Sequence, residues 1–101
     1  MDKIEIFICK LREVIELAER ECDSIDAGNV SKWNKGVLKN CVSCEMHELL
    51  TYALKGEVLF KYGKKQRLLK STYILTDSLE HLDNTPLGEK ITELQKLYYS
   101  L

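Results

Sequence analysis

Apolar side chains recur every three or four residues through most of this chain, the spacing that places them on one face of an α-helix. The clearest case is residues 3–25, where an apolar face opposes a charged one and predicts a long first helix. Its apolar positions are Ile4, Phe7, Ile8, Leu11, Val14, Ile15, Ala18, Cys22 and Ile25. Residues 26–29 tolerate left-handed backbone, so we expect the helix to end there.

Residues 43–63 form the longest stretch that fits one amphipathic helix, with Ser43 suited to cap its start and Gly63 its end. Gly56 lies inside this predicted helix, where glycine is unfavourable by about 1 kcal/mol relative to alanine. We therefore expect Gly56 to mark a close crossing of two helices.

Between residues 30 and 42, polar residues and a glycine interrupt the apolar pattern. The segment is compatible with a short extra helix near residues 30–40 or with an irregular lead-in to the next helix. It contains Trp33, the only tryptophan, between two lysines. Because tryptophan is usually largely buried with its N–H near water, we expect Trp33 in the core or at its rim, with a binding surface as the alternative.

Two more helices are expected in the second half of the chain. One covers residues 65–82, and the next starts where Thr85 can cap and Pro86 can occupy the first helical position. Four amphipathic helices with short connections favour an all-α, up-and-down, antiparallel four-helix bundle. With 101 residues, the chain fits a single helical-bundle domain, 1–101.

The last helix has an apolar stripe wider than one core face, because Leu97, Tyr98, Tyr99 and Leu101 all lie near its end. A stripe of this width predicts a homodimer formed through the C-terminal helix.

Composition narrows the functional classes. Fifteen basic and 16 acidic side chains give a net charge of −1, which does not favour nucleic acid as the partner. No apolar run approaches the roughly 20 residues that span a bilayer, and charges interrupt the apolar N-terminal stretch, unlike a signal peptide. We therefore expect a cytoplasmic protein without membrane contact.

Cys41, Cys44 and His47 form a C-x2-C-x2-H cluster, and thiolates with an imidazole at such spacings can bind zinc. Candidates for a fourth ligand are Cys9, Cys22 and His81. On a continuous helix, however, Cys41 and His47 point in different directions. The main interpretation is that the cysteines pack as small apolar residues in a reducing compartment, with metal or redox sensing as the alternative.

The stretch Tyr52-Ala53-Leu54-Lys55-Gly56 resembles the active-helix motif of histidine-containing phosphotransfer domains, which are also four-helix bundles. Leu54, Lys55 and Gly56 match the leucine-lysine-glycine run of that family, whereas Tyr52 stands where its phosphorylated histidine should be. The resemblance covers about five residues and implies an inactive bundle that docks on a similar partner.

The sharpest charge feature is a basic run comprising Lys61, Lys64, Lys65, Arg67 and Lys70. A solvated helix terminus is the simplest interpretation, and contact with an acidic protein, nucleic acid or anionic membrane are the alternatives. Together with Trp33, the run is the candidate partner surface.

No set of side chains predicts catalysis, because Glu45, His47, Glu48 and Glu57 are scattered around one predicted helix. We therefore expect no enzyme and no cofactor. The predicted function is a small helical bundle that binds another protein, as a regulator, an inhibitor or an immunity- or antitoxin-like adaptor. The alternatives are metal or redox sensing through the Cys41 cluster, nucleic-acid binding through residues 61–70, and the phosphotransfer-like docking bundle.

Overall fold

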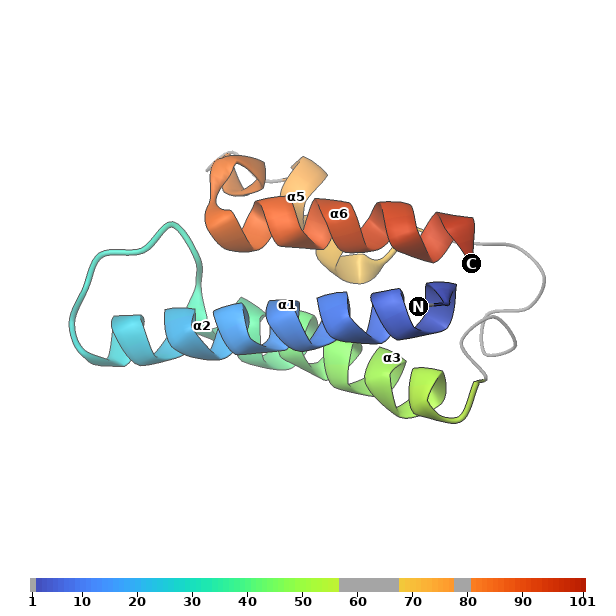
Figure 1. The fold of residues 1–101 in the computed structure, drawn as a ribbon. Coiled ribbons are helices and arrows are strands. Elements are labelled where there is room, and N and C mark those ends of the chain that lie inside the picture. The colour runs from blue at the N-terminus through green and yellow to red at the C-terminus, as the bar shows by residue number, and fades with distance from the viewer. Residues whose placement is uncertain (1, 57–67, 78–80) are drawn as a thin grey trace.

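The computed structural model describes residues 2–56, 68–77 and 81–101, which fold into an all-α helical bundle (Figure 1). The elements are α1 (Lys3–Asp26), α2 (Lys35–Val37), a π-helical turn (Leu38–Ser43), α3 (Cys44–Leu54), α5 (Lys70–Asp77), a 3-10 turn (Leu82–Asn84) and α6 (Pro86–Ser100). No β-strand occurs within these ranges. The predicted fold class is confirmed.

Helix α1 lies between α3 and α6 and runs antiparallel to both (Figure 1). At one end of the bundle, Lys3 Nζ donates a hydrogen bond to the carbonyl oxygen of Ser100 at 3.1 Å. At the other end, an ion pair joins Lys35 to Asp26. Helix α5 runs across α6 in Figure 1 instead of alongside it, so a strict up-and-down order of four helices remains a prediction.

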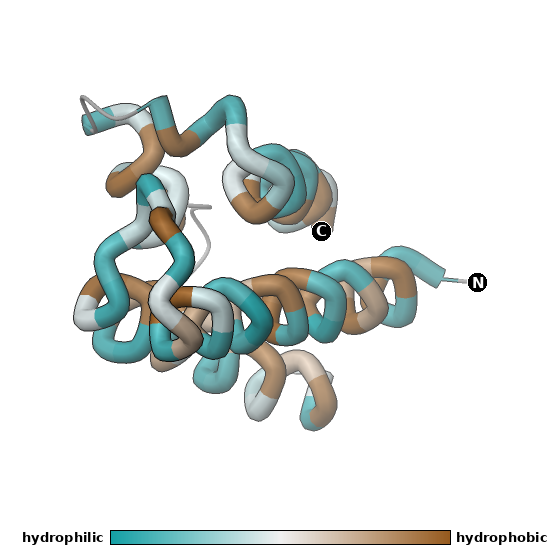
Figure 2. Tube along the Cα trace, turned by 90° about the vertical axis from the view of Figure 1, so that its left-hand side faces the viewer, coloured by the Kyte–Doolittle hydropathy of each residue, from teal (hydrophilic) through white to brown (hydrophobic). Residues whose placement is uncertain are grey.

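The sequence of α1 explains both of its ends and its buried face. Asp2 caps the start, since its Oδ1 accepts a hydrogen bond from the Glu5 N–H at 2.8 Å. After Asp26, Gly28 takes a left-handed φ of 90° and turns the chain away, as predicted. Hydrophobic and hydrophilic residues alternate along the helix (Figure 2), and the buried ones are Phe7, Leu11, Val14, Ile15 and Ala18.

The middle helical segment begins earlier than predicted. Asn34 is its N-cap, because the Asn34 Oδ1 accepts a hydrogen bond from the Val37 N–H at 3.1 Å. Ser43 has helical φ and ψ of −62° and −44° and makes no side-chain cap bond, so the prediction that Ser43 caps this helix is wrong. The predicted extra helix near residues 30–40 is the first turn of this longer segment, which continues through a π-helical turn into α3.

The same segment also ends earlier than predicted. Gly56 has a left-handed φ of 72°, and its N–H donates to the Ala53 carbonyl at 3.0 Å, so Gly56 closes the end of α3. A Cβ placed on Gly56 would have no atom of the described residues within 4 Å, which contradicts the predicted helix crossing there. Gly63 lies outside the described residues.

The core is built from all the longer helices, and the rings of Phe7 and Tyr98 contact each other at a tilt of 48° with a centroid distance of 5.9 Å. Tyr98 is only 1% exposed, and Leu97 and Leu101 pack against the core. Tyr99 is 44% exposed. Most of the wide apolar stripe of α6 therefore packs inside the bundle, and the homodimer remains a prediction.

Candidate functional site

Trp33 is held rigidly at the end of the bundle where α1 stops and α6 starts. Its side chain is 5% exposed, and its Nε1 donates to the Thr85 hydroxyl at 3.1 Å. That hydroxyl also accepts from the Gly88 N–H at 3.0 Å and donates to the Leu82 carbonyl at 2.6 Å. Thr85 thus caps α6, as predicted, and fixes the indole at the same time. The expectation that Trp33 packs in the core or at its rim is confirmed.

A solvent-open hollow of about 340 Å³ lies between the Trp33 segment and α5. It is lined by Lys32, Trp33, Asn34, Val37, Tyr73, Ile74, Asp77 and Leu82, and we call it the Trp33–Tyr73 groove. Tyr73 forms part of its wall while being 58% exposed, a large value for an aromatic ring. Since an apolar cavity of about 150 Å³ can hold benzene, the groove has room for an aromatic or leucine side chain of another molecule.

A second hollow, of about 440 Å³, is also lined by Trp33. Leu17, Val30, Pro86 and Leu87 supply its apolar lining, with Arg20, Glu21 and Lys32 among its polar residues. Val30 is fully exposed. Trp33 therefore lines two hollows at this end of the molecule, and each also includes an exposed side chain, Tyr73 in the first and Val30 in the second.

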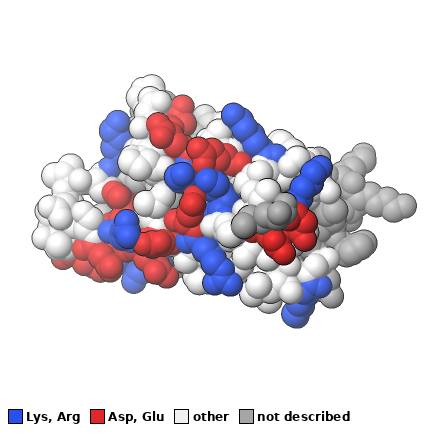
Figure 3. All heavy atoms as spheres, viewed as in Figure 1, with Lys and Arg blue, Asp and Glu red and all other residues white. Residues whose placement is uncertain are grey.

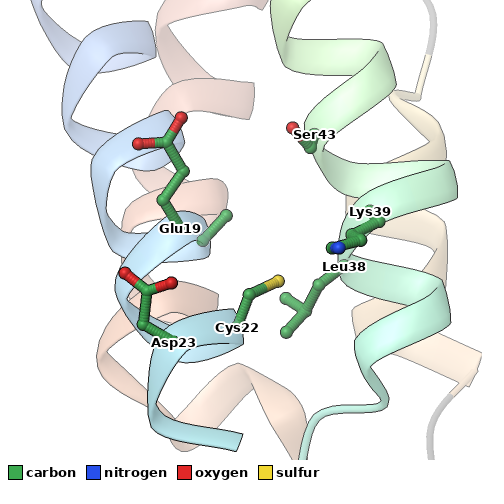
Figure 4. Close-up of a pocket in the computed structure, with 7 residues that line it drawn as sticks. Glu19, Cys22, Asp23, Leu38, Lys39 and Ser43 are labelled. Carbon is green, nitrogen blue, oxygen red and sulfur yellow. The ribbon is translucent and has the colours of Figure 1, made fainter. Parts of the chain in front are cut away.

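A third hollow, of about 200 Å³, lies between α1 and the π-helical turn (Figure 4). Figure 4 shows the Cys22 thiol extending from α1 toward Leu38, with the carboxylates of Glu19 and Asp23 nearby on α1. Cys22 is partly buried and packs against the core, as the apolar interpretation of the cysteines predicts. Cys9, by contrast, is exposed.

The predicted metal cluster is not assembled. In the part of the chain that the structure describes, no three His, Cys, Asp or Glu side chains are grouped so as to hold a metal ion. Cys41 lies in the π-helical turn, and the Cys44 thiol donates to the Lys39 carbonyl at 3.3 Å. Cys41, Cys44 and His47 therefore do not form a common ligand set, because six helical positions separate the first from the last.

The basic run falls mostly outside the described residues, which exclude Lys61, Lys64, Lys65 and Arg67. Lys70 is exposed at the first position of α5. In Figure 3, acidic side chains gather over the C-terminal half of α1, with basic ones among them. The prediction that the basic run contacts a partner stays a prediction.

The start of α5 is held by two buried polar side chains that sequence reasoning missed. Glu45 of α3 is 5% exposed; its Oε2 accepts from the Lys70 N–H at 2.7 Å, and its Oε1 accepts from the Ser71 N–H and hydroxyl, each at 2.8 Å. Gln95 of α6 is also 5% exposed, and its Oε1 accepts from the Leu69 N–H at 2.8 Å. We call Glu45 and Gln95 the α5 clamp. The only sequence signal for it was the lack of a capping residue before Lys70.

An ion-pair group joins α1 to α6. Lys10 Nζ lies 3.0 Å from a carboxylate oxygen of Glu93 and 3.0 Å from one of Glu13, and Lys90 lies 3.6 Å from each carboxylate. Hydrogen bonds to these two carboxylates raise the pKa of Lys10 well above its ordinary range. The same bonds lower the pKa of Glu13 and of Glu93 below 4.5. These ion pairs join the two helices at the surface of the bundle.

Comparisons with family models, curated proteins and solved structures give no match to this chain. Among the described helices, none has both the length and the apolar character needed to cross a bilayer. In the stretch that resembles phosphotransfer domains, Tyr52 is partly buried against the core and Gly56 ends the helix.

Proposed function

We propose that this chain is a small, non-enzymatic cytoplasmic protein that binds another protein through the Trp33–Tyr73 groove. The observation that carries the proposal is an exposed aromatic ring, Tyr73, standing beside an open apolar hollow whose floor includes the buried Trp33. Aromatic residues at such sites supply much of the binding free energy in protein interfaces.

The groove suits an apolar side chain presented by a partner helix or loop. Its floor is preformed, because the Nε1 bond to Thr85 fixes the indole before any partner arrives. A preformed site loses less conformational freedom on binding than a mobile one, which favours affinity. Lys32, Asn34 and Asp77 at the groove supply polar groups of both charges that can orient the partner's backbone.

The lining of the groove supports binding over catalysis. Among the described residues, its polar side chains carry an ammonium group, an amide, a carboxylate and the phenol of Tyr73, and they include no serine, threonine or cysteine nucleophile and no histidine base. Tyr73 exposes its aromatic ring to solvent, and exposed tyrosines of this kind commonly anchor protein interfaces.

Site-specific photo-crosslinking tests the proposal. A benzophenone amino acid at Asp77, which lines the groove, should form a crosslink to one dominant protein in the native cell, and the same group at the exposed Thr51 should not. The crosslinked protein is then purified, and its affinity is measured by calorimetry.

Tyr73→Ala should weaken that affinity by about tenfold or more, equivalent to about 1.4 kcal/mol. Tyr99→Ala is the matched control, since Tyr99 is another exposed tyrosine and does not line the groove. Equal affinities for the Tyr73→Ala variant and the unmodified protein would show that the groove is not the binding site.

A further inference from the structure

Helix α5 depends on contacts from outside itself. Its described part spans eight residues, Lys70–Asp77, and isolated helices shorter than about 12–15 residues are marginal in water. The two residues before it, Leu68 and Leu69, have no side-chain oxygen that could cap its first N–H groups. The acceptors come instead from Glu45 of α3 and Gln95 of α6, which together bind the N–H groups of residues 69, 70 and 71.

A continuous path of hydrogen bonds leads from this clamp to the groove. Gln95 accepts from the Leu69 N–H, and the Leu69 carbonyl in turn accepts from the Tyr73 N–H at 3.0 Å. Tyr73, Ile74 and Asp77 are the residues of α5 that line the groove. The facing wall is fixed separately by the bond between Trp33 and Thr85. The width of the groove is therefore set by the position of α5.

We propose that Glu45 and Gln95 are positioning residues for the Trp33–Tyr73 groove: by holding the start of α5, they place Tyr73 opposite Trp33 and so control partner docking. The effect of the clamp on partner binding rests on the proposed function. The placement of α5 can be tested without any partner. Neither residue touches the groove, since both act through the backbone of α5.

Two variants each weaken one half of the clamp while nearly keeping the side-chain volume. Glu45→Gln replaces one acceptor oxygen by an amide donor, and Gln95→Met removes the acceptor for Leu69. We expect backbone amide exchange in residues 70–77 to accelerate by about tenfold or more, while exchange in the buried turns of α1 stays unchanged. The emission of Trp33, the only tryptophan, should move to longer wavelength as the groove opens.

Two controls separate positioning from general weakening of the fold. Glu19→Gln removes an exposed carboxylate of α1 and should change neither readout. Val14→Ala removes buried apolar atoms of α1 and weakens the core. It should neither shift the emission of Trp33 nor accelerate amide exchange in α5 more than elsewhere. The proposal would be overturned if, in both clamp variants, amide exchange in residues 70–77 and the emission of Trp33 match those of the unmodified protein.

If Glu45→Gln abolishes the helical circular dichroism signal, Ser71→Ala takes its place, because it removes only one of the donors to Glu45 and keeps both backbone bonds. The same selective loosening of α5 is expected, to a smaller extent, and its absence would overturn the proposal.

The Asp77 crosslink then tests the binding consequence. It should be lost in Gln95→Met and kept in Glu19→Gln, and a crosslink that survives in Gln95→Met would show that the clamp does not control docking. If the unmodified protein itself gives no crosslink, the proposed function fails, and the exchange and emission results still decide whether the clamp places α5.

Discussion

The indole N–H of Trp33 donates a hydrogen bond to the hydroxyl of Thr85 across 52 positions of sequence. The bond joins the loop that follows α1 to the first turn of α6. Because the same hydroxyl accepts from the Gly88 N–H, one side chain both starts a helix and fixes the floor of the groove. The local structure of α6 and the shape of the proposed binding site are therefore coupled through Thr85.

Thr85→Ala should destabilise the protein by about 2 kcal/mol. Loss of a helix N-cap costs about 0.5–2 kcal/mol, and loss of the acceptor for a buried donor adds a similar amount. The free energy of unfolding, measured in urea, checks the value. Thr85→Ser keeps the hydroxyl and should lose less than half as much, so equal losses in the two variants would mean that the hydroxyl is not responsible.

Gly88 is buried, and Gly88→Ala should be more damaging than alanine substitution of any surface residue of α6. A Cβ on Gly88 would lie 1.9 Å from the carbonyl oxygen and 2.8 Å from the carbonyl carbon of Leu82, and these backbone atoms cannot rotate away. Overpacking of this kind typically costs about 1–3 kcal/mol, and we expect about 3 kcal/mol or more here.

Thermal unfolding followed by circular dichroism checks the Gly88 prediction. Lys96→Ala, at an exposed position of the same helix, is the control and should change stability by no more than about 0.5 kcal/mol. A stable Gly88→Ala protein would mean that the 3-10 turn at Leu82 is free to move.

The ion pairs of Lys10 should make stability depend on pH in a defined window. Glu13 and Glu93 have pKa values lowered from 4.5 by their hydrogen bonds to Lys10, so their contribution is present above pH 4.5 and is lost as the pH falls through the lower folded-state pKa. The pKa of Lys10 is raised from 10.5, so its contribution is present below pH 10.5 and is lost at higher pH.

Lys10→Met tests this window. The difference in unfolding free energy between the unmodified protein and this variant should be largest between pH 4.5 and 10.5 and should shrink on acidification below it. About 1 M salt should also reduce the difference by screening. Lys96→Met, which removes a lysine without an ion pair in the described part of the chain, should show neither dependence. A difference that is constant from pH 3 to 7 would contradict the assignment.

Sequence reasoning identified the elements whose signals are local. The apolar spacing of residues 3–25 predicted α1, residues 26–29 marked its end, and Thr85 with Pro86 marked the start of α6. Each signal involves residues within one or two helical turns, and their caps work wherever the helix is placed. The burial of Trp33 followed from its size and chemistry.

The errors arose where two local signals competed. Ser43 and Asn34 are both capable caps, and the helix starts at Asn34 because the chain after it can continue through a π-helical turn. Gly56 could sit inside a helix or end it, and the structure uses its left-handed conformation to end α3. Sequence spacing alone could not choose between these outcomes.

By itself, then, the sequence determined a helical class, the first helix and the capped start of the last one, since backbone hydrogen bonding and apolar periodicity act over a few residues. Only the tertiary structure decided that Glu45 and Gln95 hold α5 and that Tyr73 stands across a hollow from Trp33. Those contacts join residues about 25 or more positions apart, and their partners are chosen by the packing of whole helices, which leaves no local pattern in the chain.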